Sequence, residues 1–137
     1  MYAHCIKRVI DLVVSLAGIV LLSPLLGAIV LAVRFTLGSP VLFRQQRPGL
    51  RAKPFTLLKF RTMTNARDSE GNPLPDAVRL TSFGRLLRST SFDELPSLIN
   101  VLRGEMSLVG PRPLLMQYLD RYTAEQTRRH DIRPGIT

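Results

Sequence analysis

Two adjacent carboxylates, Asp93 and Glu94, stand in the middle of a chain that is otherwise strongly basic. Apolar residues recur after them at i, i+3, i+4 and i+7, and these residues are Leu95, Leu98, Ile99 and Leu102. This spacing predicts a helix with one apolar face toward a core, and Gly104 is expected to end it. The acidic pair therefore falls in or beside the first turn, where free amides and the helix dipole favour negative charge.

Acidic residues at a helix start have a simple interpretation and a functional one. They often only stabilise the helix. Ser91 and Glu94 have the spacing of a capping box, but Pro96 is more compatible with a helix that starts at Phe92 or Asp93. The same place also suits a bound phosphate. The pair by itself does not decide between helix stabilisation and chemistry.

The composition points to an anionic partner. The 137-residue chain has a formal charge of +9, with three lysines and sixteen arginines, and arginine suits bidentate contacts to phosphate or carboxylate. The arginines are scattered, tryptophan is absent and no zinc-finger or RNP-type motif occurs, so no nucleic-acid partner is expected. An anionic membrane surface or a phosphorylated ligand fits better.

An uncharged run of 22 residues, from Leu12 to Val33, is a candidate membrane segment. A straight helix of that length measures roughly 33 Å and would cross a hydrocarbon core of about 30 Å. Ser23-Pro24 lies near its middle, and a turn there would leave two legs of roughly 17 Å each, which is a re-entrant hairpin. Basic residues flank both ends, as expected if both face the cytoplasm, but a kinked spanning helix remains equally compatible.

The rest of the chain predicts a small α+β domain. Residues 41–46 and 55–63 are predicted strands of a β-hairpin around Pro48-Gly49, with Lys59 and Arg61 on one face of the second strand. Residues 64–76 predict a loop, and a short helix that carries Arg88 follows it.

Beyond Gly104, a short extended piece leads to Arg112, which Pro111 and Pro113 hold on a stiff loop. Residues 114–129 then predict an amphipathic helix, with Leu115, Tyr118, Leu119 and Tyr122 on one face. The charged residues of this segment lie largely off that face.

The motifs, taken in order, strongly resemble the bacterial polyprenyl-phosphate sugar-1-phosphate transferases, also called monotopic phosphoglycosyl transferases. The resemblance covers essentially the whole chain, and the short N-terminal extension resembles that of the small bacillosaminyl phosphate transferase-like members. It is carried by Lys7-Arg8, the run broken at Ser23-Pro24, Arg47-Pro48-Gly49, Lys59-Phe60-Arg61-Thr62-Met63, Asp93-Glu94-Leu95-Pro96, the stretches 100–104 and 106–113, and Arg133-Pro134-Gly135-Ile136-Thr137.

The resemblance implies transfer of a sugar-1-phosphate from a UDP-sugar to polyprenyl (undecaprenyl) phosphate, with release of UMP. It implies that Asp93 is the nucleophile that carries a covalent phosphosugar and that Glu94 helps to hold Mg²⁺. Arginines and lysines must then neutralise the diphosphate, and the substrate-binding candidates are Arg88, Arg112, Lys59, Arg61 and Pro111. A carboxylate nucleophile needs no separate base, and the helix start is expected to keep Asp93 ionised.

The resemblance also implies two parts: a re-entrant membrane helix over residues 1–40, and a cytoplasmic catalytic domain over residues 41–137 at the bacterial inner membrane. Members of the family continue beyond the Pro-Gly-Ile-Thr stretch, so this chain is expected to lack their C-terminal portion. The alternative function is a non-catalytic membrane-anchored module that binds anionic lipid or a glycan-assembly partner. The sequence specifies neither the sugar, the glycan pathway nor the oligomeric state.

Overall fold

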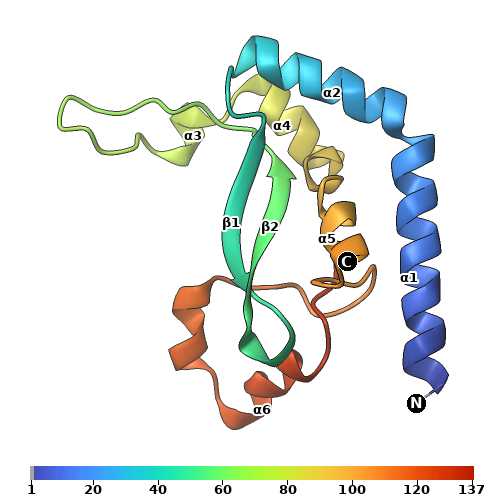
Figure 1. Ribbon diagram of the computed structural model, residues 1–137. Helices are drawn as coiled ribbons and strands as arrows, with labels where there is room; N and C mark the ends of the chain where they lie inside the picture. The colour runs from blue at the N-terminus through green and yellow to red at the C-terminus, as the bar shows by residue number, and fades with distance from the viewer. Residues whose placement is uncertain (1) are drawn as a thin grey trace.

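The computed structural model describes residues 2–137 and shows a mixed α and β chain built around one β-hairpin (Figure 1). The elements are α1 Tyr2–Leu21, α2 Ser23–Thr36, β1 Leu42–Pro48, η1 Leu50–Ala52, β2 Pro54–Phe60, α3 Asp76–Arg79, α4 Ser82–Ser89, η2 Phe92–Glu94, α5 Ser97–Arg103, η3 Met116–Arg121, α6 Ala124–Thr127 and η4 Arg128–Asp131. The expected fold class, α+β with a short hairpin, is confirmed at this level.

The long apolar segment breaks at the predicted place. Helix α1 ends at Leu21, α2 begins at Ser23, and the two helices are bent by 64°. Pro24 cannot donate a backbone hydrogen bond to the Val20 carbonyl, and the Ser23 hydroxyl donates to that oxygen instead over 2.8 Å. Within the described chain no single helix is long and apolar enough to span a membrane, whereas the bent pair meets that test when both helices are taken together.

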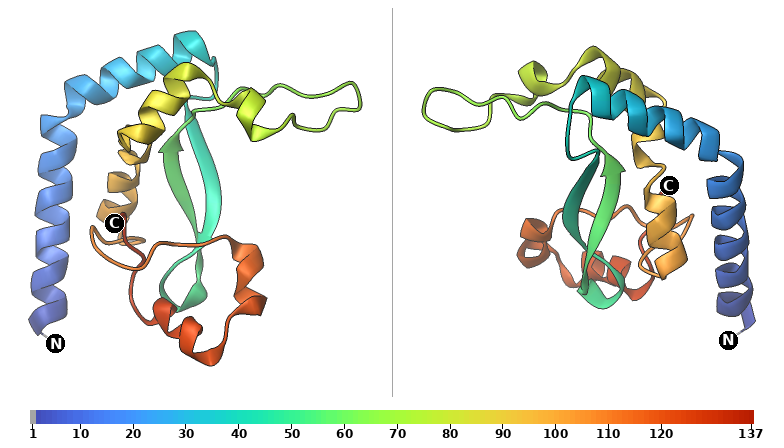
Figure 2. Two further views of the ribbon diagram at one scale, coloured as in Figure 1. Left: turned by 180° about the vertical axis from the view of Figure 1, so that it is seen from behind. Right: turned by 45° about the horizontal axis from the view of Figure 1, so that its top comes forward.

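Helix α1 has one face toward the protein and a wide apolar face away from it. Asp11 and Ser15 are buried, and a methyl group added at Gly18 would lie 3.5 Å from Leu98 of α5, so α1 packs closely along α5 (Figure 2). The opposite face leaves large side chains exposed: Ile6, Val9, Ile10, Val13, Val14, Leu16, Val20 and Leu21. A continuous apolar surface of this kind suits lipid better than water.

Polar contacts fix the N-terminal half of α1 to the rest of the chain. The Asp11 carboxylate accepts hydrogen bonds from the Ser107 hydroxyl at 2.8 Å and the Leu108 amide at 3.2 Å. Arg8 donates to the Val101 carbonyl at 2.7 Å, near the C-terminal end of α5, where a cation also opposes the negative end of the helix dipole. These contacts tie the apolar helix pair to the elements that follow it.

Strands β1 and β2 pair antiparallel, from Leu42 opposite Phe60 to Pro48 opposite Pro54, which confirms the predicted hairpin with slightly different bounds. The hairpin stands in the middle of the molecule, with α4 and α5 beside it on the side toward α1 and the C-terminal segments around its turn (Figures 1 and 2). Buried side chains form two clusters on β2. Ile29, Val33 and Leu87 surround Phe60, while Val101 and Met106 surround Phe55 and Leu57.

Helix α5 packs on β2 through a different face from the one predicted. The predicted apolar stripe is only partly buried, and Ile99 is exposed, whereas Ser97, Asn100 and Val101 are fully buried. The reason is that β2 has an unpaired edge. Asn100 accepts from the Leu58 amide at 3.1 Å and donates to the Thr56 carbonyl at 2.8 Å, so a polar face satisfies backbone groups that would otherwise be buried without partners.

The predicted single helix over residues 114–129 is wrong. Tyr122 and Thr123 have extended backbone angles and separate η3 from α6. Thr123 instead starts a new helix through a capping box, in which its hydroxyl accepts from the Gln126 amide and the Gln126 side chain accepts from the Thr123 amide. This local cap competes with continuation of the helix.

The predicted polar loop and the short helix after it are present. Residues 64–75 form an extended loop that projects away from the other elements (Figure 1). Helix α4 begins after Thr81, whose side chain accepts from the Gly84 amide at 2.9 Å. Helix α4 ends at Ser89, four residues before Asp93.

Candidate active site

Asp93 lies in the short turn η2, between α4 and α5, rather than in the first turn of α5. Ser91 precedes it with φ 60° and ψ 15°, a left-handed conformation that is strained for a residue other than glycine. Neither Ser91 nor Pro96 caps its helix through a side chain, so the capping box, one of the two possible helix starts, is absent from the described structure. In this turn Asp93 is only 8% exposed.

The environment of Asp93 acts on its charge in two directions. Burial raises the pKa of this carboxyl, and the neighbouring Glu94 adds to the increase. The charges of Lys59 and Arg88 lower the pKa and offset part of the effect, so that the net shift is upward from the ordinary value of 3.8. Burial therefore opposes ionisation of Asp93 more strongly than Lys59 and Arg88 favour it, and Asp93 lies in the turn η2 rather than at the start of α5.

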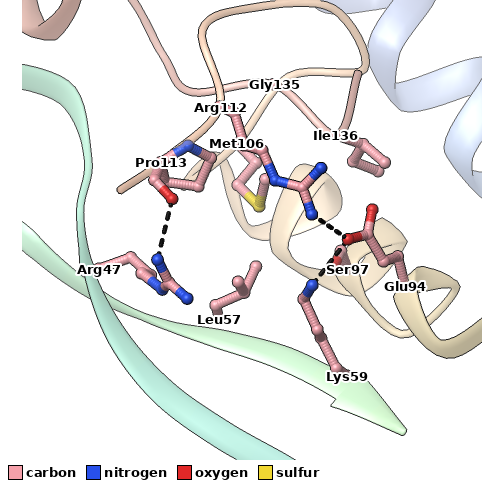
Figure 3. A pocket seen from close by; sticks show the side chains of 10 residues that line it. All are labelled: Arg47, Leu57, Lys59, Glu94, Ser97, Met106, Arg112, Pro113, Gly135 and Ile136. Atoms are coloured by element: carbon pink, nitrogen blue, oxygen red, sulfur yellow. Dashed lines mark hydrogen bonds and ion pairs between the residues drawn. The ribbon is translucent and has the colours of Figure 1, made fainter. Parts of the chain in front are cut away.

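Glu94 forms ion pairs with two cations from distant parts of the chain. Its Oε1 accepts from Lys59 Nζ of β2 at 2.6 Å and from Arg112 Nη2 at 2.8 Å, and Figure 3 shows both side chains converging on this oxygen. Lys59 and Glu94 are about four-fifths buried, whereas the Arg112 side chain is 69% exposed. The predicted acidic and basic residues therefore form one cluster.

Arg88 and Arg61 occupy the same region with different partners. Arg88 of α4 donates from Nε to the Thr62 hydroxyl at 3.0 Å, which holds its guanidinium beside the acidic pair. Arg61 is buried and donates to the backbone carbonyls of Met63 at 2.9 Å and Ser39 at 3.0 Å. Part of the Arg61 guanidinium thus supports the backbone at the end of β2.

An open cleft of about 1190 Å³ brings most of the predicted residues together. Its lining includes both carboxylates and four predicted cations: Asp93, Glu94, Lys59, Arg61, Arg88 and Arg112. Pro111 is outside the lining within the described chain, and its carbonyl accepts from the Gly135 amide at 3.0 Å. The cleft also has an apolar side, formed by Val41, Leu42, Phe43 and Phe60.

Three further arginines line the cleft without having been predicted as site residues: Arg44, Arg47 and Arg79. Arg47 is half-buried, and burial together with the charge of Arg112 lowers the pKa of its guanidinium. The Arg47-Pro48-Gly49 motif indicated that the position mattered, but nothing in the spacing of the sequence places β1 beside the loop of Arg112.

The donor set fits a magnesium ion that is shared with a phosphorylated ligand. Within residues 2–137 no three His, Cys, Asp or Glu side chains group closely enough to form a metal cage. Mg²⁺ commonly uses only one or two carboxylates together with substrate phosphates and waters. Both Glu94 cations bond to Oε1, so Oε2 of Glu94 and the adjacent Asp93 carboxyl are the candidate ligands.

A buried carboxyl, a second carboxylate and several cations in one open cleft are typical of a site that binds an anionic ligand. The comparison with protein families agrees with this class. The model of the bacterial sugar transferase family matches residues 2–137, and the chain belongs to that family. The family expected from the motifs is thereby confirmed.

Curated relatives match along nearly the whole chain. The chain is 58% identical over 132 residues to an uncharacterised sugar transferase, EpsL, of Bacillus subtilis. It is 45% identical over 141 residues to the UDP-glucose:undecaprenyl-phosphate glucose-1-phosphate transferase of Caulobacter vibrioides. It is 36% identical over 137 residues to the UDP-N-acetylgalactosamine-undecaprenyl-phosphate N-acetylgalactosaminephosphotransferase of Aeromonas hydrophila.

These alignments cover 96% of this chain but only part of each relative. The matched region is 65% of the Bacillus protein, 51% of the Caulobacter protein and 32% of the Aeromonas protein. The chain thus spans less than two thirds of the relatives' own length. The relatives' names also differ in the sugar that they transfer.

Proposed function

We propose that this chain transfers a sugar-1-phosphate from a UDP-sugar to undecaprenyl phosphate and so starts the assembly of a glycoconjugate. The observation that supports the proposal most is the position of Asp93, buried in a cleft beside Glu94, Lys59 and Arg88. The names of the Caulobacter and Aeromonas relatives support the substrate classes.

The proposed reaction has two displacements at one phosphorus. A lone pair of the Asp93 carboxylate forms an O–P bond to the sugar-bearing phosphorus of the UDP-sugar. The bond from that phosphorus to the bridging oxygen breaks, and its electron pair leaves with UMP. An oxygen of undecaprenyl phosphate then attacks the same phosphorus, and the Asp93 carboxylate leaves with its electron pair restored.

The cations of the cleft carry the electrostatic part of the proposal. A carboxylate can approach a diphosphate only when the negative charge of the latter is neutralised. Arg88 and Lys59 flank the buried carboxyl, while the exposed side chain of Arg112 can exchange its contact with Glu94 for one with phosphate. Glu94 would hold Mg²⁺ together with the diphosphate, and the ion would supply further neutralisation of charge.

We further propose that the bent helix pair lies re-entrant in the cytoplasmic face of the bacterial inner membrane, and the 64° bend supports the re-entrant part of this proposal. Undecaprenyl phosphate is a lipid and the UDP-sugar is soluble in water, so the reaction needs a site at the boundary between the two. Helix α2 contributes Ile29 and Val33 to the core around Phe60, which lines the cleft, so the site adjoins the apolar pair. In this arrangement membrane lipid surrounds the outward face of α1.

An assay of UMP release tests the proposal. Purified protein in detergent or liposomes, supplied with Mg²⁺, undecaprenyl phosphate and a panel of UDP-sugars, is expected to release UMP with at least one sugar. Asp93→Asn should abolish release, whereas Asp120→Asn, at an exposed position away from the cleft, should retain it. Full turnover by Asp93→Asn, or no release with any sugar, would contradict the proposal.

A further inference from the structure

The loop that carries Arg112 is held through three consecutive backbone carbonyls. The Pro111 carbonyl accepts from the Gly135 amide at 3.0 Å, the Arg112 carbonyl from Arg129 Nη2 at 3.1 Å, and the Pro113 carbonyl from Arg47 Nη1 at 3.2 Å. The three donors come from the C-terminal segment, from η4 and from β1. The backbone of this loop is therefore fixed from three separate parts of the fold.

The fixed backbone of this loop is important because the contacts of the Arg112 side chain are too weak to hold it in place. This side chain is 69% exposed, and an ion pair with an exposed partner is too weak to order a long side chain in one geometry. Pro111 and Pro113 restrict the backbone on either side of Arg112, but they provide no amide donors to anchor the loop. The bond from Arg112 to Glu94 therefore depends on where the surrounding contacts place the loop.

Arg47 is the more strongly held of the two side-chain donors. It is half-buried on β1, and its Nη2 donates to the Gln45 side chain at 2.6 Å while Nη1 reaches the Pro113 carbonyl. Figure 3 shows its guanidinium directed at Pro113, on the side of the pocket opposite Lys59 and Glu94. Arg129 makes its contact at the exposed surface, beside the Tyr122 ring, so its contribution should be smaller.

We infer that Arg47 and Arg129 are positioning residues that act on the reaction through Arg112. They hold the loop so that Arg112 reaches Glu94 and, with substrate bound, the diphosphate. This inference rests on the proposed function for its effect on turnover, but the placement of Arg112 by the two arginines is testable without turnover. Arg47 also lines the cleft, and direct contact with substrate is the competing role.

A double-mutant cycle separates these roles. Arg47→Gln should lower kcat/KM about tenfold in the otherwise unchanged protein, Arg129→Gln should lower it less, and Arg128→Gln, an exposed neighbour in η4, should leave it unchanged. In an Arg112→Gln background, Arg47→Gln should have almost no further effect. If turnover of the Arg112 variant is too slow to measure, the same four proteins can be compared by their dissociation constants for UDP, which report the coupling between Arg47 and Arg112.

Equal losses from Arg47→Gln in both backgrounds would overturn the inference, because Arg47 would then act independently of Arg112. A readout that needs no activity is hydrogen exchange of the Arg112 guanidinium, followed by ¹⁵N NMR and assigned with Arg112→Lys. Exchange should become faster in Arg47→Gln and Arg129→Gln but not in Arg128→Gln. Unchanged exchange would overturn the positioning role, whereas faster exchange in a protein that never releases UMP would refute only the proposed function.

Discussion

Asp93 is the residue at which burial and charge oppose each other most clearly. A buried carboxyl is harder to ionise, and Lys59 and Arg88 offset part of that effect by stabilising the anion. A carboxylate kept less solvated and held near cations is suited to attack at phosphorus, because little bound water must be displaced before it reacts. The raised pKa is therefore an electrostatic consequence of placing this carboxyl, the proposed nucleophile, inside a cleft.

The first prediction concerns the acid side of the activity profile. Activity needs ionised Asp93, so kcat/KM should fall as pH decreases through the pKa of this carboxyl, which lies above 3.8. Lys59→Met removes a charge that lowers this pKa, and the acid limb should move to higher pH. The measurement is kcat/KM for UMP release against pH. Lys53→Met, exposed in the hairpin turn, should leave the limb in place, and a limb that Lys59→Met does not move would refute the assignment.

The second prediction concerns stability. A carboxyl whose pKa is raised on folding binds its proton more tightly in the native state. The contribution of Asp93 to the free energy of unfolding is therefore most favourable below pH 3.8, and it decreases as pH rises through the folded pKa. Asparagine cannot ionise, so Asp93→Asn should raise Tm at neutral pH, and this advantage should diminish as pH falls toward 3.8. Thermal unfolding across this pH range measures it, with Asp120→Asn as the control. A lower Tm for Asp93→Asn at neutral pH would contradict the account.

Among the elements, α5 has the most specific fit to its neighbour. Asn100 is fully buried, and its side chain bonds to backbone groups on the unpaired edge of β2. Asn100→Leu should destabilise the fold by about 3 kcal/mol, because the Leu58 amide and the Thr56 carbonyl would both remain buried without partners. Asn72→Leu, exposed in the polar loop, should change the free energy of unfolding by less than about 0.5 kcal/mol. Denaturant unfolding compares the two variants, and equal values would refute the edge role.

The apolar helix pair is the second element whose geometry has a direct consequence. At the break, the Ser23 hydroxyl donates a hydrogen bond to the Val20 carbonyl, so this backbone oxygen has a partner despite the 64° bend. Because the pair turns rather than continuing straight, the two flanks are predicted to lie on the same side of the membrane. This placement is what the re-entrant proposal requires of the whole molecule.

Labelling of single cysteines in sealed cells tests that topology. Cys5 is exposed and natural to the chain, and Arg44→Cys in a Cys5→Ser background reports the other flank. Both should react with a membrane-impermeant thiol reagent only after the cells are opened, as should Glu70→Cys in the exposed loop. Reaction of one flank in intact cells but not the other would show a spanning helix and contradict the hairpin.

At the scale of the whole molecule, periodicity and turn residues predicted the hairpin, the break at Ser23-Pro24 and the loop after β2. Those features depend on local preferences, which residues such as Pro24 and Gly104 express strongly. The buried face of α5 was not predictable, because Asn100 is buried only to satisfy an edge strand more than 40 residues earlier in the chain. For the same reason the contact between Arg47 and the loop of Arg112 emerged only from the fold.

The central claim is that Asp93 carries the phosphosugar covalently, and intact-mass spectrometry tests it most directly. The protein is incubated with Mg²⁺ and the UDP-sugar that supports turnover, without undecaprenyl phosphate, and its mass is then measured. The account predicts a mass increase of one sugar phosphate, mapped to Asp93, absent from Asp93→Asn and lost when undecaprenyl phosphate is added. UMP release with acceptor present but no adduct under any trapping condition, or an adduct mapped to another residue, would contradict it.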